Sequence, residues 1–482
     1  MDRERLFRRL FSGTLWQGAG LIVANLASFA TKLLLARLLV PEYFGLVGMA
    51  VVFTGLIQTI EKLGIEQALV QRPDDNFDDD DLITGHWGAI LTGALLYLLI
   101  VLPGAPLVAR FYEEPALTAI IIVLALPILI EPWAVIHKIR LKRRLKFKHL
   151  AKVEMVATVL GAIFAIALAL LGAGVWALVA QWIVFATATT LILYAIEPAI
   201  PSGRFSLDAW RAILRFGAYV TGHRICSFLS KQSDYLIVGK LVGATTLGAY
   251  TIAFLLTEAI RSKLMAVLSR VLFPAYSRLQ GDLPALNRYY LGSIRLQTLV
   301  VAPILCALLI CSEPILLYAF GEEWLPASRA LQLLAIAALI HTIGGTNSSA
   351  LKAIDRPDLS FKVRLFETFV VMIPALLLLV PAYGIEGAGL AVIAAKTTSR
   401  LAYHWQMRTH IGTTEPQVFK AILPALSSTL VMALSLIWLM HQFPPQSLLQ
   451  TLLIICLGGI LYLLAALPQV YREGIQIWHR LR

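Results

Sequence analysis

The sequence predicts an all-α protein that crosses a membrane about fourteen times. Hydrophobic residues make up 58% of the 482 residues and charged residues only 15%, and apolar runs of roughly 20 residues recur along the whole chain. Soluble proteins carry about 25% charged residues, and a soluble core could not bury this much apolar surface. Continuous apolar runs also exclude a β-barrel, whose strands alternate apolar and polar residues.

Fourteen spans follow from the positions of the apolar runs. They are expected near 13–36, 44–64, 83–108, 116–136, 150–171, 174–196, 212–238, 246–273, 293–318, 327–350, 361–380, 385–403, 418–440 and 448–467. Four connections between them are very short and contain proline or glycine: 37–43 with Pro41, 172–173 with Gly172, 239–245 with Gly243, and 381–384 with Gly384. Such short connections force the helices that they join to be antiparallel neighbours.

The lysines and arginines between the spans predict the orientation. With the N-terminus in the cytoplasm, 30 cations fall on the cytoplasmic side, eight of them within 138–152, and four fall on the outer side. Cytoplasmic loops are enriched in these residues, so both termini are expected to be cytoplasmic. The formal net charge of +12 has the same explanation, and no nucleic-acid partner is expected.

The chain is expected to form two lobes of six spans each, followed by a helix pair. The N-lobe is assigned to 1–200, the C-lobe to 212–410, and the last pair with its basic tail to 411–482. An amphipathic linker helix at 201–216 is expected to lie in the cytoplasmic interface. Its polar side holds Arg204, Asp208, Arg211 and Arg215, and its apolar side holds Phe205, Trp210, Ile213 and Leu214.

An internal repeat supports the two lobes. Residues 37–45 align with residues 240–248 at a constant offset of 203, and both stretches end in a glycine, Gly45 and Gly248. Six predicted spans separate them, so the two halves have the same orientation, as in transporters built from parallel repeats. Chance similarity between two apolar hairpins is the alternative.

Ionisable residues within spans are energetically expensive and mark candidate functional faces. One face of the seventh span carries Arg224, Ser227, Lys231 and Asp234. The eighth span carries Glu258, Arg261 and Lys263 near its centre. The surplus of cations favours a water-filled cavity for an anionic group such as a phosphate or diphosphate. Ion pairs between residues three apart, Lys231 with Asp234 and Glu258 with Arg261, are the structural alternative.

Four further residues are candidates for a polar cavity: Lys32, His341, Asn347 and Lys396. Lys32 could instead reach the outer headgroups, and Lys396 could simply anchor the twelfth span. His341 and Asn347 flank Gly344 and Gly345, a glycine pair that predicts a break in the tenth span. The second span also has a polar side, which is expected to face the cytoplasmic interface: Thr54, Gln58, Glu61 and Lys62.

No metal or organic cofactor is expected. The acidic run 74–81 lacks the EF-hand spacing and is interpreted as a solvated loop, and the four cysteines lie within apolar runs without metal-ligand spacing. No nucleotide-binding or hydrolase motif is visible, so an H⁺ or Na⁺ gradient is the expected energy source. Asp234 and Glu258 are the coupling candidates, unless both form permanent structural ion pairs.

Several short motifs occur in a familiar order. They are 68–72 before the acidic run, 110–112 with 114–117, 145–148 before Glu154, Gly172 with 174–181, Asp234 with 238–240, Gly248 and Tyr250, and 271–280. In this order, over residues 10–400, they resemble polysaccharide-specific transporters of the multidrug/oligosaccharidyl-lipid/polysaccharide (MOP) exporter superfamily. Within it, the sequence is most similar to Wzx-type flippases of the colanic-acid exporter kind.

The resemblance implies two six-helix lobes in a V-shaped arrangement, plus two C-terminal helices. It implies that the chain is a transporter and not an enzyme. The transporter is expected to flip undecaprenyl-diphosphate-linked oligosaccharide across a bacterial inner membrane, alongside a polysaccharide polymerase and chain-length or export machinery. It transfers no catalytic motif, so the candidate residues come from the buried charges alone. The alternatives are a drug/cation antiporter, a lipid II flippase, and a membrane glycosyltransferase or polymerase.

Overall fold

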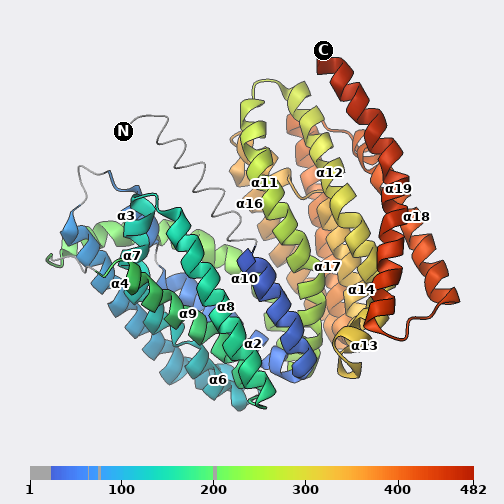
Figure 1. Ribbon diagram of the computed structural model, residues 1–482. Helices are drawn as coiled ribbons and strands as arrows, with labels where there is room; N and C mark the ends of the chain where they lie inside the picture. Colours follow the sequence, from blue (N-terminus) through green and yellow to red (C-terminus); the bar gives the residue numbers. More distant parts are fainter. Residues whose placement is uncertain (1–22, 63, 74–77, 199–202, 482) are drawn as a thin grey trace. The chain divides into compact units, whose positions relative to one another are not determined.

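The computed structural model describes residues 23–62, 64–73, 78–198 and 203–481, and within these ranges all regular structure is helical (Figure 1). The all-α prediction is therefore confirmed. The chain divides into two compact units, Met1–Gly248 and Ala249–Arg482. This division lies well beyond the predicted linker at 201–216, and the assignment of lobes made from the sequence stays a prediction.

The first unit consists of a series of α-helices and one short π-helical turn, η2. They are α2 (Pro41–Glu61), α3 (Ile65–Gln71), α4 (Asp79–Leu99), η2 (Ile100–Gly104), α5 (Ala105–Tyr112), α6 (Ala116–Leu124), α7 (Pro127–Arg143), α8 (Phe147–Leu170), α9 (Val175–Ile196) and most of α10 (Leu207–Phe254). Residues 23–38, before α2, are also helical.

The second unit continues from the end of α10. Its elements are η3 (Leu255–Ala259), α11 (Ile260–Arg278), α12 (Leu283–Ile310), α13 (Ser312–Ala319), η4 (Glu322–Trp324), α14 (Ala327–Thr342), α15 (Asn347–Ala353), α16 (Pro357–Leu365), η5 (Phe366–Met372), α17 (Ile373–Ile411), α18 (Glu415–Gln442) and α19 (Leu448–Leu481).

Eleven helical stretches among the described residues are long and apolar enough to cross a membrane. Two of them exceed a single crossing, Arg224–Met265 with 42 residues and Pro357–Ile411 with 55. Each covers two of the predicted spans. Residues 13–22 of the first predicted span lie outside the described ranges, and its remaining residues, 23–36, are helical. The chain is a multi-pass membrane protein, and the count of fourteen stays a prediction.

Two glycines interrupt these long stretches. Gly243 has φ of 79° and Gly384 has φ of 55°, and both lie where one helix ends and the next begins. Glycine alone adopts this region without a steric penalty from a Cβ atom. The predicted short connections at 239–245 and 381–384 are therefore confirmed as turning points of the chain.

The predicted linker helix begins at Leu207 and continues into α10 without a break before Gly243. Asp208 and Arg211 of its predicted polar side are exposed. On its predicted apolar side, Ile213 is 2% exposed and Phe205 is 44% exposed. The apolar side packs on its own unit: Ile213 joins a core with α3, α4 and α7. Trp210 lies over Gly88 of α4, where a Cβ would come within 2.2 Å of the indole.

Charged residues fix the corner formed by α3, α4 and α7. Arg143 donates hydrogen bonds to the carbonyl oxygens of Leu69 and Arg72, 2.8 Å each, and so caps the C-terminal end of α3. Asp78 caps α4, accepting a hydrogen bond from the Asp81 amide at 2.8 Å. Asp81 is 5% exposed and pairs with Arg72. The interpretation of 74–81 as a solvated loop is thus wrong for its last residues, which begin a helix.

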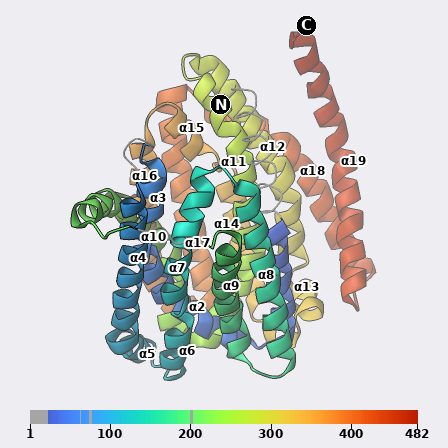
Figure 2. The same ribbon diagram turned by 60° about the vertical axis from the view of Figure 1, so that its left-hand side comes forward.

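The last two helices pack on the second unit through α12. A buried cluster joins Cys311 at the end of α12 to Met432 and Leu436 of α18 and Ile454 of α19. Tyr462 of α19 donates a hydrogen bond to the Leu299 carbonyl of α12 at 2.7 Å. In Figures 1 and 2, α19 lies beside α18 in the second unit.

The two repeat glycines meet in a reciprocal contact within the first unit. A Cβ on Gly45 would lie 1.7 Å from the Ala244 carbonyl oxygen, and a Cβ on Gly248 would lie 1.7 Å from the Pro41 carbonyl oxygen. Pro41 and Ala244 are themselves 203 residues apart. When a local two-fold axis relates two segments that touch, each segment makes the same contact with the other. The contact supports the predicted internal repeat.

Candidate functional site

A charged cavity lies in the first unit between α2, α3, α4, α7 and α10. Its volume is about 110 Å³, and it is lined by Glu61, Lys62, Ile65, Glu66, Gln67, Ala89, Glu131, Val135, Lys138 and Arg224. Of its cations, Arg224 is a predicted cavity residue, and Lys62 belongs to the polar side of the second span named from the sequence. Lys138 comes from α7 and Lys62 from the residue after α2, so three separate segments bring their charges together.

Carboxylates balance the cations of the charged cavity. Lys62 Nζ lies 3.6 Å from Glu131 Oε2, and Glu66 pairs with Lys142. Glu61 is only 3% exposed. The lining of this cavity therefore has as many acidic residues as basic ones, and not the surplus of cations expected from the sequence. Arg224 remains half-buried at the cavity wall.

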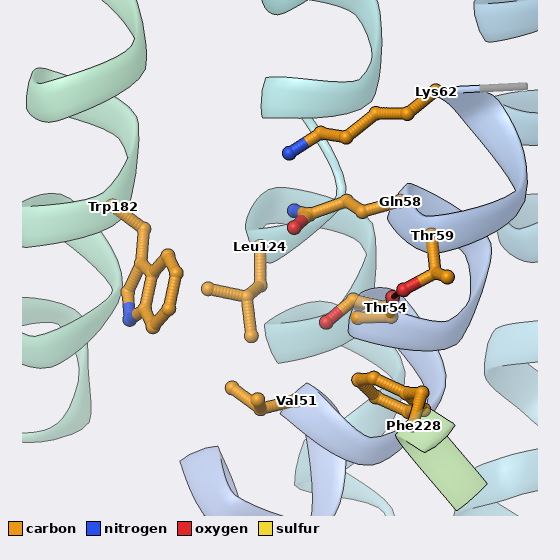
Figure 3. Close-up of a pocket in the computed structure, with 9 residues that line it drawn as sticks. Val51, Thr54, Gln58, Thr59, Lys62, Leu124, Trp182 and Phe228 are labelled. Carbon is orange, nitrogen blue, oxygen red and sulfur yellow. Dashed lines mark hydrogen bonds between the residues drawn. The ribbon is translucent and has the colours of Figure 1, made fainter. Parts of the chain in front are cut away.

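A second cavity, which we call the tryptophan groove, adjoins the charged cavity and shares Lys62 with it. It measures about 220 Å³ and is lined by Val51, Thr54, Gly55, Gln58, Thr59, Lys62, Leu124, Trp182 and Phe228. Figure 3 shows Gln58 and Lys62 of the α2 segment extending toward the side on which Trp182 of α9 lies. The polar side of the second span thus lines two cavities of the first unit. The expectation that it faces the interface is wrong for Thr54 and Glu61, which are 2% and 3% exposed.

The other predicted residues of the first unit have different surroundings. Lys231 is exposed, whereas Ser227 and Lys32 are half-buried. Asp234 is 2% exposed and accepts a hydrogen bond from the Tyr235 amide at 2.9 Å. Arg224 and Asp234, ten residues apart on α10, thus differ clearly in exposure.

The second unit contains a buried ion cluster around Glu258. Arg261 Nε lies 2.8 Å from Glu258 Oε2, and Arg261 Nη2 lies 2.5 Å from Glu258 Oε1. His341 Nδ1 of α14 lies 3.5 Å from Glu258 Oε1. The ion pair expected from the i, i+3 spacing is therefore present, and a histidine from another helix joins it. Lys263 is half-buried.

Lys396 also has a carboxylate partner. Its Nζ lies 2.7 Å from Glu367 Oε1, and the two side chains are 20% and 13% exposed. Glu367 is absent from the sequence-based candidates, although a carboxylate inside the predicted span 361–380 was an available signal. Glu258 and Glu367 each lie on a π-helical turn, η3 and η5, a feature that is frequent at functional sites.

A hydroxyl network surrounds the predicted break in the tenth span. The break is confirmed, because α14 ends at Thr342 and α15 begins at Asn347. Tyr276 bonds to Ser293 at 2.5 Å and to Thr346 at 3.2 Å. Tyr290 donates a hydrogen bond to the Asn347 side chain. Asn347, only 2% exposed, therefore has a structural partner.

Acidic, histidine and cysteine side chains do not gather into a group of three suited to a metal ion in the part of the chain that the structure describes. The cysteines Cys226, Cys306, Cys311 and Cys456 are all free thiols.

Comparison with known proteins relates the chain to one family. Residues 34–329, more than half of the chain, match the family described as polysaccharide biosynthesis protein. The chain is 26% identical over 357 residues to the teichuronic acid biosynthesis protein TuaB of Bacillus subtilis (strain 168), covering 73% of each chain. It is 26% identical over 379 residues to the lipopolysaccharide biosynthesis protein WzxC of Escherichia coli (strain K12), covering 77% of this chain and 75% of that one.

The fold also has a solved counterpart. The structure of the lipid II flippase MurJ in an inward closed conformation superposes with a TM-score of 0.77, covering 96% of this chain and 100% of that one. The sequence identity is 17%, so the likeness concerns the fold. The resemblance noted from the sequence motifs is thus confirmed at the level of family and fold.

Proposed function

The chain belongs to the polysaccharide biosynthesis protein family, and from this membership we propose that it flips a lipid-linked oligosaccharide across a bacterial inner membrane. The family match over residues 34–329 carries the proposal. Its relatives are named for the synthesis of teichuronic acid and lipopolysaccharide, and its fold is shared with a lipid II flippase. Helices suited to crossing a membrane surround polar cavities, as transport of a polar head group requires.

The charged cavity is the proposed site for the diphosphate of the substrate. Arg224, Lys62 and Lys138 line it from three segments, and charge-assisted hydrogen bonds from such groups are the strong contacts for phosphate oxygens. The Lys62–Glu131 separation of 3.6 Å and the 52% exposure of Lys62 leave this ammonium available to an incoming phosphate. When the substrate binds, Lys62 would exchange its partner Glu131 for the diphosphate, while the lipid tail remains in the bilayer.

The test of this site replaces Arg224 by Ala and, conservatively, by Lys. In a deletion strain complemented with the Ala variant, we expect surface polysaccharide to fall about tenfold, the effect of losing one charge-assisted contact, with partial recovery in the Lys variant. Arg211→Ala is the matched control, because Arg211 lies on the same helix with 77% of its side chain exposed. Equal polysaccharide from wild type and Arg224→Ala, at equal protein levels, would remove Arg224 from the site.

Energy for net transport is proposed to come from an ion gradient, with Glu258 and Asp234 as coupling groups. The pairing of Glu258 with Arg261 and His341 permits a carboxylate that changes partners between states, and it equally fits a fixed structural pair. Transport in proteoliposomes with an imposed pH or Na⁺ gradient separates these, comparing wild type with Glu258→Gln and Asp234→Asn. Flux that ignores both gradients excludes coupling and leaves the flippase proposal intact.

The same strain distinguishes the remaining alternatives. If the chain is a flippase, its deletion leaves lipid-linked oligosaccharide on the cytoplasmic leaflet. If it is a drug/cation antiporter, its deletion leaves polysaccharide unchanged and increases drug sensitivity. Loss of lipid II transport would stop cell-wall synthesis, and loss of a glycosyltransferase would truncate the sugar itself. Within this proposal the chain is a transporter and not an enzyme, and it works beside a polysaccharide polymerase.

A further inference from the structure

The tryptophan groove combines an apolar wall with uncommitted polar groups. Trp182 is 41% exposed, and it lines the groove together with Leu124 and Phe228. Opposite lie the polar side chains of α2 (Figure 3). Gly55 allows Phe228 to approach α2, because a Cβ there would lie 2.9 Å from the Phe228 ring. The groove is therefore formed by α2, α6, α9 and α10 together.

Its polar groups are free to bind a ligand. Within the described part of the chain, neither the Gln58 carboxamide nor the Trp182 indole N–H makes a side-chain hydrogen bond to another residue. Thr54 and Thr59 donate to the backbone oxygens of Ala50 at 3.0 Å and Gly55 at 2.8 Å. Their hydroxyl oxygens keep lone pairs for accepting hydrogen bonds. The groove thus offers both donors and acceptors around an aromatic face.

A sugar ring has the complementary chemistry. Its faces carry C–H groups that pack on an aromatic surface, and its edge carries hydroxyls that both donate and accept hydrogen bonds. A phosphate would instead require cations, of which this groove has Lys62 at one end. A purely apolar ligand would leave the amide and the hydroxyls unpaired, which costs free energy.

We propose that the tryptophan groove binds one sugar ring of the lipid-linked oligosaccharide, packed on Trp182 and hydrogen-bonded by Gln58. The inference rests on the proposed flippase function and adds a saccharide subsite to it. Lys62 borders both cavities, so a diphosphate in the charged cavity places an attached sugar at the entrance to the groove. The volume of about 220 Å³ is below the roughly 300–1,000 Å³ of pockets for larger ligands, which limits the subsite to a single ring.

The experiment compares two probes on the purified full chain in detergent. One probe is the lipid-linked oligosaccharide extracted from the deletion strain, and the other is undecaprenyl diphosphate without sugar. Wild type is expected to bind the sugar-bearing probe more tightly. Trp182→Ala should weaken that binding by about fivefold, the loss of one aromatic contact, while binding of undecaprenyl diphosphate stays unchanged. Trp182→Phe should retain most of the preference.

Two further variants separate the subsite from effects on folding. Gln58→Ala, on a different helix, should reduce the same preference. Trp176→Ala is the matched control, because Trp176 also belongs to α9, is also 41% exposed and does not line the groove. It should bind both probes as wild type does.

The outcomes distinguish the two proposals. Equal binding of both probes by wild type, or an unchanged preference in Trp182→Ala and Gln58→Ala, overturns the saccharide subsite and leaves the flippase function standing. Failure of wild type to bind either probe overturns the flippase proposal and the subsite with it. Loss of the preference in Trp176→Ala as well as in Trp182→Ala also overturns the subsite, because the effect is then not local to the groove.

Discussion

Glu258 and Arg261 form an enclosed ion pair between two of the candidate residues. Their side chains are 22% and 6% exposed, and two hydrogen bonds of 2.8 and 2.5 Å join them. Removing charges from water is costly, and the mutual attraction offsets that cost only while both partners are present. Each residue therefore depends on the other, whatever further role Glu258 has in transport.

We expect Glu258→Gln to destabilise the protein by about 3–5 kcal/mol, because it leaves the Arg261 guanidinium buried without its partner. The measurement is thermal unfolding of the purified protein in detergent. Combining Glu258→Gln with Arg261→Met should recover part of this loss, since no uncompensated charge remains. Asp208→Asn is the comparison at an exposed pair, since the side chains of Asp208 and Arg211 are 94% and 77% exposed, and it should leave the stability almost unchanged. Similar losses from Glu258→Gln and Asp208→Asn would contradict a desolvated pair.

The residue patterns that the sequence predicts are those set by local spacing. Glu258 and Arg261 are three residues apart on helical backbone, so their pairing follows from helix geometry. Lys396 and Glu367 are 29 residues apart and meet only when η5 packs beside α17. The burial of Glu61 likewise depends on helices far from it in sequence. Lys396 and Arg224 could therefore be predicted as candidates from their charge within a span. Their carboxylate neighbours could be identified only from the tertiary structure.

At the scale of elements, Gly45 and Gly248 allow two backbones to touch. The reciprocal contacts place the start of α2 against the part of α10 after Gly243, with no room for a side chain on either helix. A close approach of this kind is how small residues serve helix pairs in membranes. The pairing of Pro41–Gly45 with Ala244–Gly248 therefore fixes the distance between these two segments.

We expect Gly45→Ala and Gly248→Ala each to destabilise the protein by about 1–3 kcal/mol, because an inserted methyl group forces backbone to move. The readout is the unfolding temperature in detergent together with the yield of folded protein. Gly222→Ala is the matched control on α10, since a Cβ there meets nothing within 4 Å. It should be neutral or stabilise the helix by up to about 1 kcal/mol. Equal stability of Gly45→Ala and Gly222→Ala would show that the backbones separate without cost.

The sequence predicts the ends of elements where backbone chemistry requires a particular residue. Gly243 and Gly384 mark turns because their positive φ values exclude most side chains. The continuation of the linker helix into α10 could not be predicted, because Gly217 directly follows the predicted linker, and a glycine at that place is typical of a helix end. In the structure the backbone at Gly217 is helical. Packing of Trp210 and Ile213 on α3, α4 and α7 decides it.

For the whole molecule, the distribution of cations predicts sidedness, and several of these cations also have structural contacts. Arg144 bonds to Glu197 at 2.9 and 3.1 Å, and Arg143 caps α3. These contacts do not change the number of lysines and arginines in a loop, and that number determines whether the loop stays in the cytoplasm. The predicted orientation therefore remains a separate question from the fold, and it is open to direct measurement.

Cysteine labelling tests both the orientation and part of the span count. In a variant with Cys226, Cys306, Cys311 and Cys456 replaced by Ala, a single cysteine is placed at Glu113 or at Asp208, whose side chains are 80% and 94% exposed. Three membrane-spanning candidates lie between them, Ala116–Arg143, Phe147–Leu170 and Val175–Ile196, so the two positions must face opposite sides.

We expect a membrane-impermeant maleimide to label Glu113→Cys in spheroplasts, because the few cations near it predict the outer side. Asp208→Cys, beside Arg204 and Arg211, should be labelled only after the membrane is permeabilised. Labelling of both positions from one side would contradict three crossings between them. Labelling of Asp208→Cys alone in spheroplasts would keep the three crossings and reverse the predicted orientation of the chain in the membrane.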